Sequence, residues 1–266
     1  MHVYKLAARG QKETTQVRVG NGRIGAGDFT FIAGPCAVES RAQLFSSARA
    51  VASVPGAILR GGLFKTRTSP YDFQGLGNEG IAYINEARAQ LRLPAVVEAL
   101  CEEHVHALKE HVDMIQIGAR NMQNVPLLRS AGRSGVPVLV KRGASATLGE
   151  LLMAAEYVLL EGNPNVVLCE RGIRGFDPET RYVFDLGGAL RLKEMTHLPV
   201  IVDPSHASGR RTLIEPLSMA AYAAGLDGVM IEVHPSPDEA RSDAAQAIDC
   251  AAFERIVRRI RRQSAA

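Results

Sequence analysis

Eight short apolar segments recur along the chain, and each is followed by a stretch of residues with helical periodicity. Continuous apolar runs of this kind are typical of parallel strands that are buried on both faces. The clearest helical stretches are 148–162 and 214–225, and a glycine stands at the end of each, as is common at a helix C-terminus. The predicted strands are 29–34, 57–61, 95–100, 114–118, 137–141, 165–170, 199–203 and 228–233.

The pattern differs at the two ends of the chain. Residues 17–25 alternate around Asn21-Gly22, and an Asn-Gly pair between such segments predicts a β-hairpin. A last helix is predicted near 239–262, and its basic run RRIRRQ suits a solvated helix C-terminus. Because the sequence contains no linker-like stretch, we expect one domain over 1–266, in which 1–28 is an N-terminal extension that carries the hairpin.

Eight β/α units with short connections indicate an α/β fold of the (β/α)8 type, a TIM barrel, rather than an open sheet. The length of 266 residues agrees with the ~250 that are typical of this barrel. In an open sheet, the ligand site lies where the strand order reverses. In a closed barrel it lies at the C-terminal ends of the strands, so the residues that carry the chemistry are expected there.

Composition and cysteine usage narrow the class of protein further. A net charge of +3 is too small to indicate a nucleic-acid partner, and 22% charged residues are ordinary for a soluble globular protein. No apolar run approaches the ~18 residues that would span a membrane, and the polar N-terminus lacks the apolar core of a secretory signal. The four cysteines form no CxxC pair, which favours free thiols in a reducing cytoplasm.

Polar and charged side chains follow every predicted strand, at the end where a barrel places its active site. One such residue alone is commonly a surface residue, but their presence at all the strand ends indicates a functional face. In chain order they are Cys36; Arg60, Lys65, Arg67, Thr68 and Ser69; Glu98; Gln116, Arg120 and Asn121; Lys141 and Arg142; Glu170, Arg171 and Arg174; Asp203 and His206; Glu232 and His234, with Asp243 beyond them.

The cations among these residues predict an anionic substrate. Brought together at one barrel mouth, they would repel each other unless anions neutralise them, and the planar guanidinium of arginine suits phosphate and carboxylate oxygens. Their number indicates several negative groups, such as two phosphates and a carboxylate, unless some cations pair with Glu98, Glu170 or Asp203. The cations concerned are Arg60, Lys65, Arg67, Arg120, Lys141 and Arg171.

A second set of residues predicts a metal site. Cys36, His206, Glu232 and Asp243 lie at or just beyond the first, seventh and eighth strands, and strand eight pairs with strand one when a barrel closes. A thiolate, an imidazole and two carboxylates would then meet. This mixed set of ligands suits a divalent ion such as Mn²⁺, Fe²⁺, Co²⁺ or Zn²⁺, and the spacing does not choose among them.

At these residues the sequence resembles the 3-deoxy-D-arabino-heptulosonate 7-phosphate (DAHP) synthase family, in its short type I-beta form without a regulatory domain. The similarity extends from about residue 17 to about residue 255. The motifs that carry it are IAGPCAVES, LRGGLFKTRTSPYDFQGLG, QIGARNMQN, LVKRG, LCERGIR, VDPSHASGRR and EVHPSPDEARSDAAQ.

The resemblance implies a transferase that condenses phosphoenolpyruvate (PEP) with D-erythrose 4-phosphate and water to give DAHP and phosphate, the first step of the shikimate pathway to the aromatic amino acids. It implies one divalent metal ion, with Mn²⁺ as the first choice, and Lys65, Cys36 and His206 as catalytic residues. Lys65 would transfer the proton, and neighbouring cations are expected to lower its pKa. By motif, the metal ligands would be Cys36, His206, Glu232 and Asp243; the PEP site Arg60, Lys65, Glu98, Arg120, Lys141 and Arg171; and the erythrose 4-phosphate site Arg67, Thr68, Ser69 and Asp203.

Two departures from the family pattern leave alternatives open. The family usually reads Lys-Pro-Arg-Thr-Ser where this chain has Thr66 in place of proline, which changes the stiffness of the loop for the aldose phosphate. The sister enzyme, 3-deoxy-manno-octulosonate 8-phosphate synthase, usually reads Lys-Ala-Asn-Arg-Ser-Ser there, so Arg67-Thr68-Ser69 favours the four-carbon sugar. The alternatives are that sister activity or a related PEP/aldose-phosphate synthase and, more remotely, a non-catalytic barrel that scaffolds a partner enzyme.

The second departure concerns regulation. Relatives often carry a ferredoxin-like domain or a fused chorismate mutase, and residues 1–28 are too few for either. We therefore expect no allosteric inhibition, or control by a separate chorismate mutase. By analogy with the family, the chain is expected to form a homodimer or homotetramer in the cytoplasm, with no nucleic-acid or membrane partner.

Overall fold

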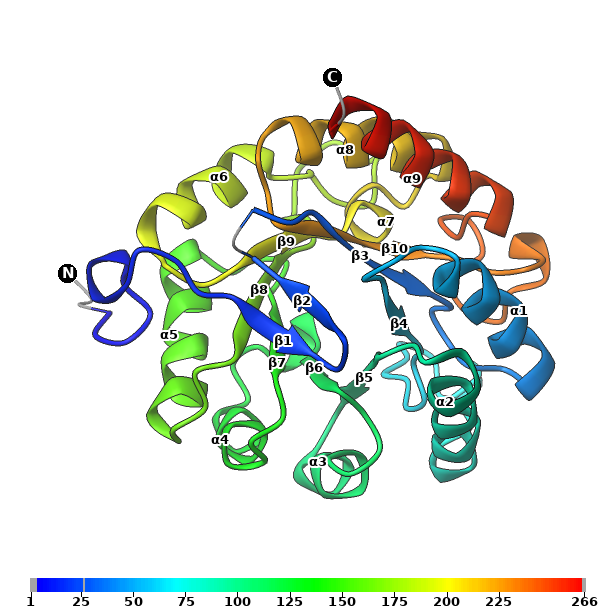
Figure 1. The fold of residues 1–266 in the computed structure, drawn as a ribbon, viewed down its shortest axis with the longest axis horizontal. Helices are drawn as coiled ribbons and strands as arrows, with labels where there is room; N and C mark the ends of the chain where they lie inside the picture. Colours follow the sequence, from blue (N-terminus) through cyan, green and yellow to red (C-terminus); the bar gives the residue numbers. More distant parts are fainter. Residues whose placement is uncertain (1–3, 26, 265–266) are drawn as a thin grey trace.

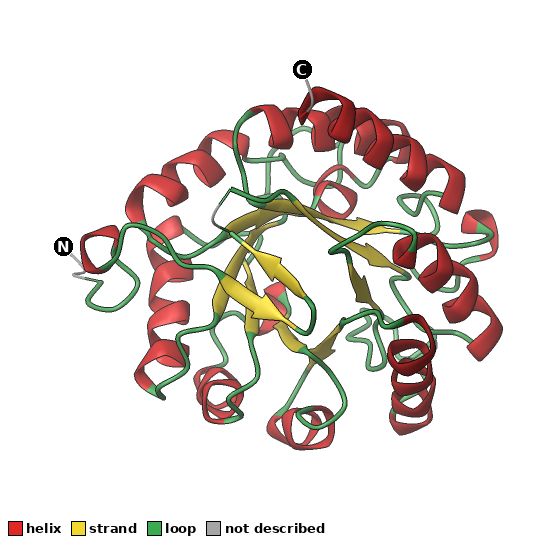
Figure 2. Cartoon of the chain, in the orientation of Figure 1, coloured by secondary structure: helices red, strands yellow, loops and turns green. Residues whose placement is uncertain are grey.

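Eight parallel strands close into a barrel in the computed structural model, which describes residues 4–25 and 27–264. The strand order is β10-β3-β4-β5-β6-β7-β8-β9, and helices surround the strands on the outside (Figures 1 and 2). The predicted (β/α)8 fold is therefore confirmed. The strands are β3 Thr30–Gly34, β4 Ile58–Arg60, β5 Ala95–Ala99, β6 Met114–Ile117, β7 Val138–Lys141, β8 Val166–Glu170, β9 Val200–Val202 and β10 Gly228–Glu232.

The helices follow the strands in turn, with a short additional helix, α7, directly after β9. No helix among the described residues is long and apolar enough to cross a membrane. The predicted stretches 148–162 and 214–225 correspond to α5 and α8 within a few residues. The helices are α1 Arg41–Ala52, α2 Asn78–Leu91, α3 Glu102–Leu108, α4 Val125–Arg133, α5 Leu148–Leu160, α6 Leu186–Met195, α7 Pro204–Ser208, α8 Arg211–Ala223 and α9 Cys250–Ser264.

The last helix was predicted to begin too early. It begins at Cys250 and not near 239, because the segment before it is not α-helical and pairs with the end of β10 instead. Asp243 has a φ of 56°, which is incompatible with an α-helix, and the backbone of Ile248 pairs with that of Glu232 and His234. The segment between β10 and α9 is thereby held against the C-terminal end of the barrel, where it presents Asp243.

The predicted hairpin is present and closes the opposite end of the barrel. Strands β1 (Val17–Val19) and β2 (Gly22–Ile24) are antiparallel, and Figure 1 shows them lying across the barrel. The turn is Gly20-Asn21, one residue earlier than predicted, and Gly20 has a φ of 57° that suits glycine. Part of the predicted extension 1–28 and domain 1–266, namely residues 1–3, 26 and 265–266, lies outside the described residues.

Alternation along the strands separates an apolar layer inside the barrel from a polar layer above it. The apolar layer takes one buried residue from each strand and packs against the hairpin: Ile32, Ile58, Val96, Met114, Leu139, Val167, Ile201 and Met230. Two positions further along each strand, on the same face, a different set follows. These residues, Gly34, Arg60, Glu98, Gln116, Lys141, Cys169, Asp203 and Glu232, form the floor on which the candidate site is built.

Candidate active site

A cavity of about 620 Å³ opens at the C-terminal ends of the strands. Eight of its lining residues are lysine or arginine, whereas three are aspartate or glutamate, so the cavity carries a strong positive charge. Most residues predicted to contact substrate lie on its wall. The predicted residues that line it are Arg60, Lys65, Arg67, Thr68, Glu98, Arg120, Lys141, Arg171, His206 and Asp243.

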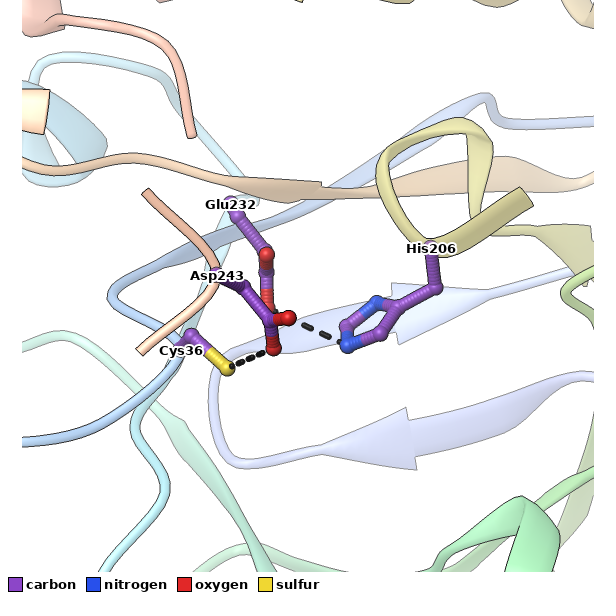
Figure 3. Close-up of side chains that lie close together, drawn as sticks. All are labelled: Cys36, His206, Glu232 and Asp243. Atoms are coloured by element: carbon purple, nitrogen blue, oxygen red, sulfur yellow. Dashed lines mark hydrogen bonds and ion pairs between the residues drawn. The ribbon is translucent and has the colours of Figure 1, made fainter. Parts of the chain in front are cut away.

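The four predicted metal ligands lie close together, as Figure 3 shows, and two of them, His206 and Asp243, line this cavity. Their ligand atoms all lie within 4.8 Å of one another. Cys36 follows β3, Glu232 ends β10, and β10 pairs with β3, so that closure of the barrel brings these two residues together. His206 comes from α7, and Asp243 comes from the segment before α9.

His206 is oriented as a metal ligand would be. Asp203 Oδ1 accepts a hydrogen bond from the backbone N–H of His206 at 2.9 Å, and Asp203 Oδ2 lies 2.7 Å from His206 Nδ1. The other ring nitrogen, Nε2, faces Glu232 Oε1 at 3.2 Å. Burial lowers the pKa of His206, which favours the neutral ring that binds metals, and a carboxylate behind a metal-binding histidine is the usual orienting group.

Glu232 is held as an ionised carboxylate. Burial alone would raise its pKa, but the attraction to the protonated form of His206 and to the permanent charge of Arg60 lowers it below its ordinary value. Arg60 Nη1 donates to Glu232 Oε1 at 2.8 Å, and Gln246 Nε2 donates to Oε2 at 2.6 Å. A carboxylate oriented from both sides in this way is preorganised to bind a cation.

Cys36 is a buried thiol next to Lys65 and Asp243. Burial raises the pKa of Cys36 to about 12. Its Sγ donates to Asp243 Oδ2 at 3.0 Å and accepts from Lys65 Nζ at 3.0 Å. A thiol of this kind binds metal by giving up its proton, so the four residues fit a divalent cation that supplies the charge to displace it.

The expectation that neighbouring cations lower the pKa of Lys65 was wrong. Burial and the charge of Arg60 act in that direction, but Cys36 and Glu98 outweigh them, and the pKa of Lys65 is raised. Its Nζ also donates to the carbonyl oxygen of Cys36 at 3.1 Å. Lys65 is therefore an ammonium group at neutral pH.

The buried cations of the floor are already neutralised. Arg60 pairs with Glu232, and Lys141 pairs with Asp203, both at side chains that are almost completely buried. In contrast, Arg171 is 6% exposed and forms no ion pair with a carboxylate within the described part of the chain. The positive charge that remains available to a substrate therefore lies above the floor of the cavity and not in the floor itself.

Two residues predicted for the aldose phosphate do not line the cavity. Asp203 is fully buried beneath it, where its carboxylate contacts Lys141 and His206. Ser69 Oγ accepts a hydrogen bond from Tyr71 N at 3.2 Å and thereby braces a turn. Arg67 does reach the cavity, and its Nη1 donates to Ser242 Oγ at 2.6 Å.

Glu98 depends on a glycine opposite it. A Cβ at Gly118 would lie 1.8 Å from Glu98 Oε1, so the carboxylate occupies the space that any other residue would fill. Gly118 belongs to the QIGARN motif directly after β6. The motif therefore contains a glycine that leaves room for the Glu98 carboxylate and, two residues later, the exposed side chain of Arg120.

Sequence reasoning missed several residues of the cavity wall. Arg181 and Tyr182 lie in the segment 171–185 between β8 and α6, more than ten residues beyond the end of β8. Arg181 Nη1 donates to Asp243 Oδ1 at 3.1 Å and to Gln246 Oε1 at 3.0 Å. No periodicity marks these positions, because their place depends on how the segment folds back over the barrel.

The fold and the site together define a (β/α)8 barrel with a positively charged cavity at its mouth and a four-residue cluster that could hold a divalent metal. The family model for the DAHP synthetase I family matches residues 10–264. The chain belongs to this family, as its motifs indicated.

Individual relatives agree with this membership. The chain is 45% identical to a phospho-2-dehydro-3-deoxyheptonate aldolase of Thermotoga maritima over 97% of its own length and 77% of that protein. A crystal structure of the Thermotoga DAHP synthase superposes with a TM-score of 0.95 at 44% identity, over 99% of this chain and 78% of that one. A 2-dehydro-3-deoxyphosphooctonate aldolase of Caulobacter vibrioides is more distant, at 32% identity over 94% of this chain and 91% of the relative.

Proposed function

We propose that this protein is a DAHP synthase, a transferase that condenses PEP with D-erythrose 4-phosphate and releases phosphate as the first step toward the aromatic amino acids. The observation that carries the proposal is the cluster of Cys36, His206, Glu232 and Asp243 at the edge of a cavity with a strong excess of cations. The similarity to the Thermotoga enzyme supports the four-carbon aldose as the acceptor.

The cluster is proposed to hold one divalent ion, Mn²⁺ in the first place, with Fe²⁺, Co²⁺ or Zn²⁺ as alternatives. When bound, such an ion would polarise the aldehyde oxygen of the aldose as a Lewis acid. The mixed donor set of sulfur, nitrogen and oxygen suits these ions better than Mg²⁺ or Ca²⁺, which prefer oxygen alone.

PEP is proposed to bind across the cavity. Its negative groups meet Arg171 and Arg120, because these guanidinium groups have no carboxylate partner among the residues described. Arg60 and Lys141 contribute from the floor, where their carboxylate partners fix their positions. The set as a whole, Arg60, Lys65, Glu98, Arg120, Lys141 and Arg171, holds PEP in line with the aldehyde so that the enol carbon can attack it.

Lys65 is proposed to supply the proton that the aldehyde oxygen takes up when the carbon–carbon bond forms. Its raised pKa keeps it protonated at neutral pH, and its Nζ lies beside Cys36 on the cavity wall. Water then adds to the carbon that bears the phosphate ester, and phosphate leaves. Catalysis thus involves Lys65 together with Cys36 and His206.

The phosphate of the aldose is proposed to bind to Arg67 and Thr68 at the outer part of the cavity. Ser69 acts through the turn that it braces, and Asp203 acts by orienting His206 and Lys141. A five-carbon aldose phosphate is the second candidate substrate, because the Caulobacter octulosonate aldolase aligns over 94% of the chain. A scaffolding role without catalysis is not favoured, because the four ligands and the PEP cations are all in place.

The test measures phosphate release from PEP with erythrose 4-phosphate or with arabinose 5-phosphate, before and after EDTA treatment and after addition of Mn²⁺. We expect turnover with the four-carbon sugar, its loss in EDTA and its recovery with Mn²⁺. Cys36→Ala should abolish metal-dependent turnover while the circular dichroism spectrum is unchanged. Preference for arabinose 5-phosphate would replace the assignment by the second candidate, and turnover that survives complete metal removal would contradict the role of Cys36.

The wider context is also a proposal. We infer that the chain works as a single barrel domain in the cytoplasm, as a homodimer or homotetramer, and that a separate chorismate mutase provides any feedback control. Light scattering of the purified protein measures its oligomeric state. Titration of the protein with a chorismate mutase of the same source, followed by the rate of phosphate release, tests the regulatory partner.

A further inference from the structure

Arg171 is a buried cation in need of an anion. It is 6% exposed, it lines the cavity, and no carboxylate in the described part of the chain forms an ion pair with it. The comparably buried Arg60 and Lys141 each have a carboxylate partner. Because an unpaired buried charge is costly, the surroundings of Arg171 are those of a group that binds an anionic ligand.

Tyr182 lies against this guanidinium. The Cζ atom of Arg171 is 4.3 Å from the centroid of the Tyr182 ring, and that of Arg181 is 5.7 Å from it. A guanidinium within about 6 Å of a ring centroid is attracted by the face of the ring. Tyr182 also lines the cavity, so its phenol group and the charge of Arg171 face the same space.

The backbone holds Tyr182 in this position. Its N–H donates to the carbonyl oxygen of Ala207 at 2.8 Å, next to His206 in α7. The following residue, Val183, exchanges two backbone hydrogen bonds with Ile173, at 2.9 and 3.0 Å. Backbone hydrogen bonds thus join the segment just after β8, which carries Arg171, to the segment that carries Tyr182. They hold the two side chains at a fixed position relative to each other.

The charges around Tyr182 make its hydroxyl a stronger hydrogen-bond donor. Burial alone would raise the pKa of Tyr182, but the charge of Arg171 and a hydrogen bond that its guanidinium donates to the phenol oxygen, together with the charges of Arg181 and Arg120, outweigh burial and lower the pKa below the ordinary value of 10.0. A more acidic phenol forms a stronger hydrogen bond to an anion, and a bond to a charged acceptor is stronger than one between neutral groups.

We propose that Tyr182 is a further substrate-binding residue, whose hydroxyl donates a hydrogen bond to the phosphate dianion that Arg171 binds. The Arg171–Tyr182 pair is then a subsite for a phosphate group, and the ring of Tyr182 fixes the guanidinium while the hydroxyl contacts the ligand. The proposed function is the basis for expecting that this phosphate group belongs to a substrate or is the released product. The subsite itself rests on the position of the two side chains.

Tyr182→Phe keeps the ring under Arg171 and removes the hydroxyl, together with the hydrogen bond that the hydroxyl accepts from Arg171. Inorganic phosphate is the probe, titrated by calorimetry into the full-length protein loaded with Mn²⁺. We expect phosphate to bind about tenfold more weakly to Tyr182→Phe, the loss of one hydrogen bond to a charged group. Tyr157→Phe is the matched control, since Tyr157 lies on α5 outside the cavity, and it should bind phosphate as the unmodified protein does. Equal affinity in Tyr182→Phe and the unmodified protein would overturn the proposal.

Tyrosine absorbance provides a second readout that a purely structural role would not change. The chain has six tyrosines and no tryptophan, so the ionisation of its tyrosines can be followed in the near ultraviolet without interference. One tyrosine should ionise at a lower pH than the others, and this step should be missing from Tyr182→Phe. Bound phosphate should move the step to higher pH, because it neutralises the guanidinium charge of Arg171. A step that is unaffected by phosphate would contradict direct contact.

The two measurements distinguish failure of this inference from failure of the proposed function. If neither aldose phosphate supports turnover but Tyr182→Phe still weakens phosphate binding, the subsite stands and the proposed reaction is wrong. If DAHP is formed but Tyr182→Phe binds phosphate normally, the reaction stands and the role of Tyr182 is wrong.

Discussion

Replacing Glu170 by glutamine is expected to stabilise the protein above neutral pH. Glu170 ends β8 with its side chain fully buried on the outer face of the barrel, the face of Leu168. Its Oε1 accepts a hydrogen bond from Gly172 N at 2.5 Å, but Oε2 has no hydrogen-bond partner among the described residues. Burial raises the pKa of Glu170 to about 7, although the Gly172 N–H and the charge of Arg142 act against it.

The sign and size of the effect follow from this pKa. The ordinary value is 4.5, so between 4.5 and about 7 the folded protein retains a proton that the unfolded chain releases. Stability therefore falls as the pH rises through this window. Because a tenfold difference in proton affinity corresponds to about 1.4 kcal/mol, ionisation of Glu170 costs the folded state about 3 kcal/mol above pH 7. Glutamine does not ionise and avoids this cost.

Urea unfolding of the unmodified protein and of Glu170→Gln, followed by circular dichroism from pH 4.5 to above pH 7, measures the effect. The difference between their free energies of unfolding should grow by about 3 kcal/mol in favour of the variant. Other titrating groups, such as His206, are present in both proteins and cancel. Glu170→Ala also removes the acceptor for Gly172 N and should be less stable than Glu170→Gln at each pH. Parallel pH profiles of the unmodified protein and Glu170→Gln would refute the reasoning.

Three further predictions concern the site. Gly118→Ala places a Cβ 1.8 Å from Glu98 Oε1, so the carboxylate must move. We expect kcat/KM for PEP to fall about tenfold or more, with little change in the thermal midpoint of unfolding. Unchanged kinetics would contradict the proposed contact of Glu98 with PEP. Asp203→Asn weakens the hydrogen bond that orients the His206 ring and should reduce the Mn²⁺ affinity, measured by calorimetry, about 10- to 100-fold. Unaltered affinity would show that Asp203 does not orient His206 as a metal ligand. Thr66→Pro should raise the free energy of unfolding by up to about 1 kcal/mol, measured by thermal unfolding. The preference for erythrose 4-phosphate should be retained, because Thr66 is exposed. A loss of stability would mean that the φ of this residue does not suit proline.

The barrel and the end of it at which the charged cavity lies could be predicted because both depend on local patterns. A strand buried on both faces must be apolar over its length, and alternation then determines which later residue points inward. Ile58 lies in the apolar layer, and Arg60, two residues further, lies in the polar floor. The same relation connects Met230 with Glu232. The convergence of the four candidate metal ligands could be predicted as well, because closure of the barrel requires that the strands ending near Cys36 and Glu232 are neighbours.

The two ends of the chain show where local patterns are insufficient. The turn of the hairpin is Gly20-Asn21, although Asn21-Gly22 is the stronger local signal, because the register places Val17, Val19 and Ile24 inside the barrel. The segment before α9 has residues that could form a helix. Its backbone instead pairs with the end of β10 and brings Asp243 to Cys36, and these are contacts with distant parts of the chain.

By itself, the sequence determined the eight strands, the end of the barrel at which the polar and charged residues gather, and the candidate ligands for a metal and for anions. The tertiary structure decided how those residues act on one another. Arg60 is neutralised by Glu232, which is 172 positions away, and Lys141 by Asp203, whereas Arg171 retains its charge beside Tyr182. Such pairings, and the pKa directions that follow from them, depend on distances between side chains from different strands and loops. Those distances exist only after the barrel has closed, because electrostatic interactions weaken steeply with separation and with exposure to water.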